Sequence, residues 1–138
     1  MNEQVLAKTA QLLDQSLGAF AAFAVLDENG YPHASVVTIT SAKGMDEIMF
    51  SSDLDSNKAR RIAKSGKSSI NYFTSNFNIT LVGTTEILTD LETKTKNWRQ
   101  GWEDMWPEGS SSPNFCVFRF KTERYSLYVD DMSAAGTL

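Results

Sequence analysis

The run Val36-Val37-Thr38-Ile39-Thr40 limits the fold most, because five consecutive β-branched residues are unfavourable in a helix and suit a pleated strand. A mostly apolar segment, residues 19–26, precedes it and ends at Asp27-Glu28-Asn29-Gly30. The Asn-Gly pair is typical of a tight hairpin turn, since such a turn needs positive φ angles. The sequence therefore predicts an antiparallel pair of strands over residues 19–26 and 31–40.

Further strands are predicted at spacings that suit hairpins. They cover residues 47–51, 68–74, 77–88, 115–121 and 125–129. We expect a turn at residues 122–124 to join the last two strands. Residues 131–138 are expected to form a loose tail.

Three helices interrupt these strands. Apolar residues at steps of three and four predict one helix over residues 5–17, and Gly66 is a suitable C-cap for a second over residues 56–65. A third helix, after Asp90, carries Trp98 and Trp102 on its apolar side. Because no βαβ alternation appears, we predict a mainly β protein with minor α. It is expected to be a single domain, residues 1–138, built as an antiparallel barrel of six to seven strands.

Composition excludes several classes of function. The chain has 138 residues and a formal net charge of −4, which argues against a protein that binds nucleic-acid phosphates. The single Cys116 and single His33 are too few for a disulfide or for a zinc site built from cysteine or histidine, so we expect no metal. Glu3 and Lys8 interrupt the apolar residues near the start of the sequence, so we expect no signal peptide there, and no apolar run of about eighteen residues is present. We therefore expect a cytoplasmic protein without membrane contact.

The segment from Phe50 to Ala59 carries the clearest functional signal. It runs from a short apolar strand into a helix start that holds Ser52, Ser56 and Lys58. The unpaired N–H groups of a first helical turn carry partial positive charge, and these side chains add three donors, so the segment suits a phosphate. A structural alternative stays open, in which Asp55 or Ser56 simply caps an ordinary helix.

Other reaction classes find little support in the residues. A serine hydrolase needs a base near its nucleophile, but His33 lies two residues from Ser35 on one predicted strand, and no Gly-x-Ser-x-Gly motif is present. The acidic pairs Asp53/Asp55 and Asp130/Asp131 are explained by caps and turns.

The order of these motifs resembles the FMN-binding split barrels related to pyridoxamine 5′-phosphate oxidase, and within them the short general-stress-protein type. The resemblance covers nearly the whole chain. It rests on Tyr31-Pro32-His33, Phe50-Ser51-Ser52, Ser56-Asn57-Lys58, Gly83-Thr84-Thr85-Glu86 and the Trp106-Pro107 step. The resemblance implies a split β-barrel with FMN as its cofactor.

The resemblance also implies which residues bind the flavin. The phosphate contacts would come from Ser51, Ser52, Ser56, Asn57 and Lys58, and the ring would lie along a strand edge formed by Ser35, Val36, Val37 and Thr38. Asn78 aligns with an amide residue that touches the flavin, and Trp106 completes the set. The chain also departs from the family. Asn57 stands where an arginine is common, and Ser35 and Thr40 stand where the full oxidases have an arginine and a lysine.

The implied activity is that of an oxidoreductase acting on a small molecule or a nicotinamide donor, with no catalytic residue assigned. No Arg- and His-containing segment follows Val129, so oxidation of pyridoxamine phosphate itself is not expected. Related barrels form homodimers with the flavin near the interface, and Trp98, Trp102 and Trp106 are candidates for either that interface or the core. The alternatives are a flavin or haem carrier or sensor without turnover, and a deazaflavin-dependent reductase.

Overall fold

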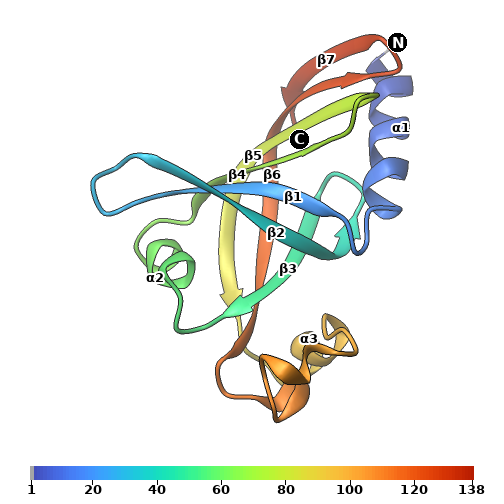
Figure 1. Ribbon diagram of the computed structural model, residues 1–138. Helices are drawn as coiled ribbons and strands as arrows, with labels where there is room; N and C mark the ends of the chain where they lie inside the picture. Colours follow the sequence, from blue (N-terminus) through green and yellow to red (C-terminus); the bar gives the residue numbers. More distant parts are fainter. Residues whose placement is uncertain (1) are drawn as a thin grey trace.

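The computed structural model describes residues 2–138 and contains seven antiparallel strands in one sheet (Figure 1). The strands are β1 (Phe20–Leu26), β2 (Pro32–Lys43), β3 (Glu47–Asp53), β4 (Lys67–Phe73), β5 (Phe77–Leu88), β6 (Phe115–Val129) and β7 (Met132–Thr137). Their order is β3-β2-β1-β4-β5-β6-β7, and an additional β3–β6 pairing closes the first six strands into a barrel. The predicted mainly β barrel is confirmed.

Helices lie at different places around this barrel (Figure 1). They are α1 (Asn2–Asp14), α2 (Asn57–Lys64) and α3 (Leu91–Lys96), followed by the 3₁₀ turns η1 (Trp102–Asp104) and η2 (Gly109–Ser111). Helix α1 packs against β2, β6 and β7, whereas α2 packs against β1 and β5. Helix α3 contacts η2 and β6 and lies at the end of the barrel away from the N-terminus.

Phenylalanines fill the centre of the barrel. Alternate residues of β1, including Phe23, are buried, as expected for a strand with one face toward the core. The Phe50 ring lies edge-on to Phe23 and to Phe118, with centroid distances of 4.6 and 5.5 Å. These contacts join three strands that are distant in sequence, so they stabilise the closed barrel.

The β1–β2 hairpin differs in part from the tight turn with positive φ angles that was expected at Asn29-Gly30. Gly30 has a φ of +82°, whereas Asn29 does not have a positive φ. The Asp27 N–H donates to the Tyr31 carbonyl at 2.8 Å, so the loop contains three residues and ends in a left-handed glycine. The turn lies where it was predicted, but only Gly30 of the Asn-Gly pair has a positive φ.

The helix after Asp90 is shorter than predicted. It ends at Lys96, and the chain then turns at Gly101, whose φ is +100°. Trp98 therefore lies between α3 and η1 and Trp102 begins η1, so the two do not share one long helix, although both remain partly buried. Their three- and four-residue spacing came from a compact aromatic cluster and not from helical periodicity.

The C-terminal part is more regular than predicted. Residues 115–129 form one continuous strand, in which Glu123 is an extra residue between the pairs Gly83↔Thr122 and Val82↔Arg124. The predicted loose tail over residues 131–138 is wrong, because β7 pairs with β6 across a turn at Asp130 and Asp131. Sequence patterns missed β7 because Met132-Ser133-Ala134-Ala135-Gly136-Thr137 has little β propensity of its own.

Candidate functional site

Strands β2 and β3 separate near the middle of β2. They pair from Lys43↔Glu47 as far as Ile39↔Phe50, with a register shift between Ile39 and Ser41. Beyond this point, residues 32–38 pair with β1, and residues 51–53 pair with β6. The two strands thus part, and a cavity of about 240 Å³ lies between them.

Three parts of the chain form the walls of this cavity, which we call the split cavity. Its lining residues are Val36, Val37 and Thr38 of β2, Ser51, Ser52 and Asp53 of β3, Lys58 of α2, and Trp102, Met105 and Trp106 of the segment after α3. The Ile39 N–H bonds toward β1, at 2.9 Å from the Ala19 carbonyl. By the alternation of an antiparallel ladder, the main-chain groups of Val36 point away from β1 and toward the gap.

The start of α2 supplies positive charge to the split cavity. Within residues 2–138, no hydrogen bond or ion pair engages the Lys58 ammonium or the Ser52 hydroxyl, and both side chains line the cavity. Ser56 has a different role. It is the N-cap of α2, and its hydroxyl oxygen accepts a hydrogen bond from the Ala59 N–H at 3.1 Å. Ser56 is therefore an N-cap, and its contact with a phosphate stays a prediction.

Asp53 adds a negative charge to the same cavity. Its Oδ1 accepts hydrogen bonds from Trp106 Nε1 at 2.8 Å and from Asn114 Nδ2 at 2.9 Å. In the part of the chain that the structure describes, Asp53 Oδ2 has no such partner. The carboxylate is thus held in one orientation, with one oxygen available to a ligand.

Aromatic rings form the wall opposite the barrel. Trp98, Trp102 and Trp106 pack edge-to-face with one another at centroid distances of 5.6–6.1 Å, and all three contact Phe115. Only 6% of Trp106 is exposed. The three indoles therefore pack within one chain, and two of them, Trp102 and Trp106, also face the split cavity.

Buried Asn97 attaches this aromatic wall to the barrel. Its Oδ1 accepts hydrogen bonds from the hydroxyls of Thr40 at 2.7 Å and Ser41 at 2.6 Å, and its Nδ2 donates to the Thr93 carbonyl at 2.9 Å. The Ser51 hydroxyl donates to the Asn97 carbonyl at 3.1 Å. We call these contacts the Asn97 cluster. They join β2, β3 and α3 at the point where the barrel opens.

Cys116 lies behind the split cavity on β6, opposite Ser52 in the ladder. Its side chain is fully buried, and the thiol donates to the Ser52 carbonyl at 3.4 Å. Burial raises the pKa of the Cys116 thiol to about 12, and the nearby Asp53 carboxylate acts in the same direction. Cys116 is therefore a neutral packing residue at neutral pH.

Seven of the eleven predicted cofactor contacts line the split cavity, namely Val36, Val37, Thr38, Ser51, Ser52, Lys58 and Trp106. Four do not. Ser56 caps α2, and the Asn57 Oδ1 accepts from Arg60 at 2.7 Å on the other side of that helix. Ser35 lies farther along β2, where its buried Oγ has no partner among the described residues. Asn78 lies on the outer face of the sheet, hydrogen-bonded to Asn71 at 2.6 Å.

Sequence reasoning missed four residues of this site: Asp53, Asn97, Trp102 and Met105. Asp53 was assigned to a cap or turn, and Trp102 was considered only for core or interface. The sequence spacing could have indicated Trp102 and Met105. They lie four residues and one residue before Trp106, so one turn of the chain brings all three side chains together. Asn97 gave no signal, because its partners Thr40 and Ser51 are distant in sequence.

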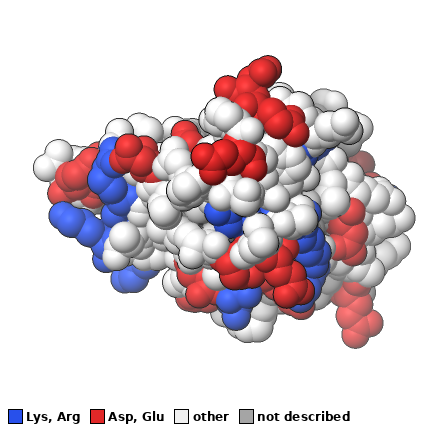
Figure 2. Space-filling model, turned by 90° about the horizontal axis from the view of Figure 1, so that it is seen from below, with Lys and Arg blue, Asp and Glu red and all other residues white. Residues whose placement is uncertain are grey.

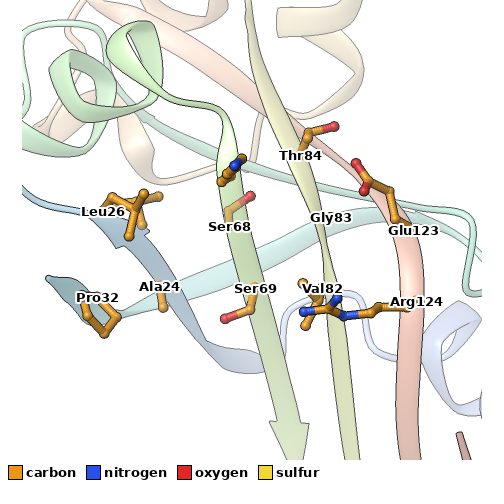
Figure 3. A pocket seen from close by; sticks show the side chains of 12 residues that line it. Ala24, Leu26, Pro32, Ser68, Ser69, Val82, Gly83, Thr84, Glu123 and Arg124 are labelled. Carbon is orange, nitrogen blue, oxygen red and sulfur yellow. The ribbon is translucent and has the colours of Figure 1, made fainter. Parts of the chain in front are cut away.

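Larger cavities lie elsewhere on the molecule, and two of them exceed 400 Å³. One, of about 490 Å³, is on the outer face of the sheet, where Leu26 and Pro32 lie on one side of β4 and β5 and Arg124 on the other (Figure 3). The second, of about 410 Å³, lies between the β1–β2 hairpin and α2. There, the Arg61 guanidinium donates to both oxygens of Glu28, at 3.0 and 3.1 Å, and lowers the pKa of that carboxyl.

Charges of both signs alternate over the surface around the α3 end. Figure 2 views this end and shows acidic and basic side chains interspersed. The basic residues of α2 contribute to this pattern, because Arg60 pairs with Asp55 and Arg61 with Glu28. This face therefore lacks the continuous basic surface that a long polyanion needs. Within residues 2–138, no helix has both the length and the apolar character to cross a membrane.

The comparisons with known proteins agree on the fold. The sequence profile of the family described as pyridoxamine 5′-phosphate oxidase matches residues 10–128, so the chain belongs to this family. The search of curated proteins finds no match.

Several solved structures share this architecture. One is a protein related to general stress protein 26, of the pyridoxinephosphate oxidase family, from Clostridium acetobutylicum. It has 24% identity and a TM-score of 0.84, over 100% of this chain and 97% of that one. Another is a pyridoxamine 5′-phosphate oxidase-related, FMN-binding protein from Nostoc punctiforme, with 13% identity, a TM-score of 0.61 and coverage of 96% and 94%. A haem-binding protein from Mycobacterium smegmatis has 17% identity, a TM-score of 0.64 and coverage of 96% and 57%. At these identities the likenesses show the fold alone.

Proposed function

We propose that this protein binds FMN in the split cavity, with the phosphate at Lys58 and the start of α2. The observation that carries the proposal is that an unpaired ammonium, a free hydroxyl and the first turn of a helix meet at one end of a gap between two strands. The FMN-binding relative from Nostoc punctiforme supports the choice of ligand. When bound, FMN supplies hydride and single-electron transfer.

The protein's own residues would bind and orient the flavin. The main-chain groups of Val36 can hydrogen-bond to a heterocycle that lies along the open edge of β2. Trp102 and Trp106 form the opposite side and would exclude water from the ligand. We therefore propose an oxidoreductase that acts on a small substrate or a nicotinamide donor.

We further propose that two copies complete the site. A cavity of about 240 Å³ is smaller than the roughly 300–1,000 Å³ typical of ligand pockets, so one chain would hold only part of a flavin. The outer face of β1 and β2 next to it is apolar, with Phe20 70% and Val36 68% exposed.

A twofold-symmetric pair would place this face against itself. Asn78 lies on the same outer side of the sheet, and so does the cavity of Figure 3. In such a dimer, Asn78 of the partner subunit could reach the flavin, whereas Asn78 of the same chain is outside the split cavity. The dimer is thus the arrangement in which the Asn78 prediction can hold.

Titration of the purified protein with FMN tests the ligand. Lys58→Ala should weaken FMN binding at least tenfold, because it removes the one cation of the split cavity. Lys64→Ala is the matched control, since Lys64 is on the same helix but lines the other cavity. Equal effects of the two variants, or a protein that carries haem and takes up no flavin, would contradict the proposal.

Reduction by a nicotinamide donor tests turnover. Anaerobic NADH or NADPH should bleach the bound flavin, and a flavin that neither donor reduces would support a carrier instead. Sedimentation tests the dimer. Ala24→Arg places a long cation in the middle of the apolar outer face and should convert a dimer into a monomer with weaker flavin binding. A wild-type monomer that binds FMN fully would contradict the shared site.

A further inference from the structure

The charges inside the split cavity cancel. Among the described residues that line it, Lys58 is the one basic residue and Asp53 the one acidic residue. Two further groups predicted to favour an anion are engaged elsewhere, because the Ser56 hydroxyl caps α2 and the Asn57 amide oxygen accepts from Arg60, and the free Ser52 hydroxyl carries no charge. The side chains that line the cavity therefore offer a phosphate no net positive charge.

The Asp53 carboxylate cannot turn away from such a ligand. Two donors on different segments, Trp106 and Asn114, hold its Oδ1, and Asn114 is itself fixed by accepting the Asp55 N–H at 2.8 Å. A sphere with the volume of the cavity is about 8 Å across, which is close to the ~8 Å Debye length at physiological ionic strength. Every point of the cavity thus lies within about one Debye length of the solvent-exposed carboxylate, so salt weakens its effect on a ligand charge without abolishing it.

We propose that Asp53 determines the charge specificity of the flavin site, by opposing the ligand's phosphate and making the site accept uncharged flavin almost as well as FMN. This inference rests on the proposed flavin binding. Its ligand class is wider than FMN and includes flavins without a phosphate, such as riboflavin. The preference for FMN, defined as the Kd of riboflavin divided by the Kd of FMN, is expected to be below about tenfold in the wild type.

Asp53→Asn tests this role without removing the hydrogen bonds. The asparagine Oδ1 can still accept from Trp106 and Asn114, while the charge is lost. The preference for FMN should rise by about three- to tenfold, the range that one unit charge exerts on a phosphate some 6–8 Å away in a water-like dielectric. Riboflavin binding should change less than twofold.

Asp55→Asn is the matched control. Asp55 is two residues away and carries the same charge, but it pairs with Arg60 outside the split cavity. The same substitution there should change the preference less than twofold. An unchanged or lower preference for FMN in Asp53→Asn, or an equal rise in Asp55→Asn, would overturn the proposal.

Salt dependence gives a measurement that needs no variant. Because opposite charges cancel in the wild-type cavity, its preference for FMN should stay nearly constant between 0.05 and 1 M NaCl. In Asp53→Asn the preference should fall as salt rises, since Lys58 alone would then act on the phosphate. A strong salt dependence in the wild type would overturn the role of Asp53. Failure of the wild type to bind either flavin would instead overturn the proposed function.

Discussion

Two register shifts in the same barrel have opposite consequences. The shift between Ile39 and Ser41 in β2 is followed by separation of β2 and β3, and a cavity lies where they part. The shift at Val82 and Gly83 in β5 leaves no space, because a Cβ at Gly83 would lie 1.9 Å from the Lys121 carbonyl oxygen. In this barrel, the bulge opens a site where its two strands then part. Beyond it, residues 32–38 of β2 pair with β1 and residues 51–53 of β3 pair with β6, whereas β5 and β6 continue to pair on both sides of their bulge.

Gly83→Ala tests the closed bulge, and we expect it to lower the free energy of unfolding more than the other substitutions do. The new methyl group would collide with backbone atoms of β6, so the strands would have to move apart. We expect a loss of about 4 kcal/mol or more in the free energy of unfolding, measured by urea denaturation. Gly109→Ala is the control, since no atom lies within 4 Å of a Cβ there. It should cost only the ~1–2 kcal/mol of its left-handed backbone. Similar losses in both variants would contradict the steric account.

Asn97→Ala tests whether the Asn97 cluster holds the aromatic wall against β2 and β3. It removes the shorter hydrogen bond of the buried Thr40 hydroxyl, which keeps only the Met49 carbonyl at 3.2 Å, and the hydrogen bond of the Asn97 amide to the Thr93 carbonyl, so we expect a loss of about 2–3 kcal/mol. Tryptophan fluorescence should also shift toward exposed indole, since Asn97 adjoins Trp98 in the aromatic wall. Asn76→Ala, on an exposed turn, should change neither quantity. Unaltered fluorescence in a destabilised Asn97→Ala would show that the cluster does not position the wall.

Ser56→Ala separates the two roles considered for this residue. Loss of the N-cap should lower the free energy of unfolding by about 1 kcal/mol. Ser56→Asp should restore it, because aspartate caps helices as well as serine does. Chemical denaturation of the three proteins measures both effects. A stable Ser56→Ala that has lost FMN binding would favour the phosphate role instead.

The smallest expected effect is the pH dependence of stability that Cys116, buried behind the split cavity, contributes. The folded protein raises the pKa of Cys116 from 9.0 to about 12, so the unfolded chain releases the thiol proton more readily. The stabilisation from the neutral thiol is complete below pH 9 and is lost as the pH rises from 9 toward 12. Between pH 8 and 9.5 we expect a loss of about 0.5–1 kcal/mol relative to Cys116→Ala, measured by urea denaturation. Parallel pH profiles of the two proteins would contradict this linkage.

The fold was predictable because strand periodicity and turn residues are local signals. Residues 77–88 were placed at their observed bounds, and α2 was placed within one residue at each end. Errors arose where tertiary contacts override local pattern. Strand β7 forms because β6 offers an edge to pair with, and α3 ends where buried Asn97 turns toward β2.

The residues of the candidate site that lie close together in the sequence were predictable. Residues 36–38, 51–52 and 58 lie on two adjoining strands and the helix that follows, so motif order was enough to bring them together. Asp53 was visible in the sequence, but its role depends on Trp106 and Asn114, which are more than fifty residues away. Whether Asn78 contributes depends on a second chain, which no pattern within one sequence determines.

The buried position of Cys116 makes this protein convenient for site-specific labelling. It is the one cysteine of the chain and is inaccessible to reagents in the folded state. A cysteine introduced at Met105, which is 59% exposed at the rim of the aromatic wall, would therefore be the one reactive thiol. A spin label or fluorophore attached there could report movement of the wall against the barrel as ligand enters.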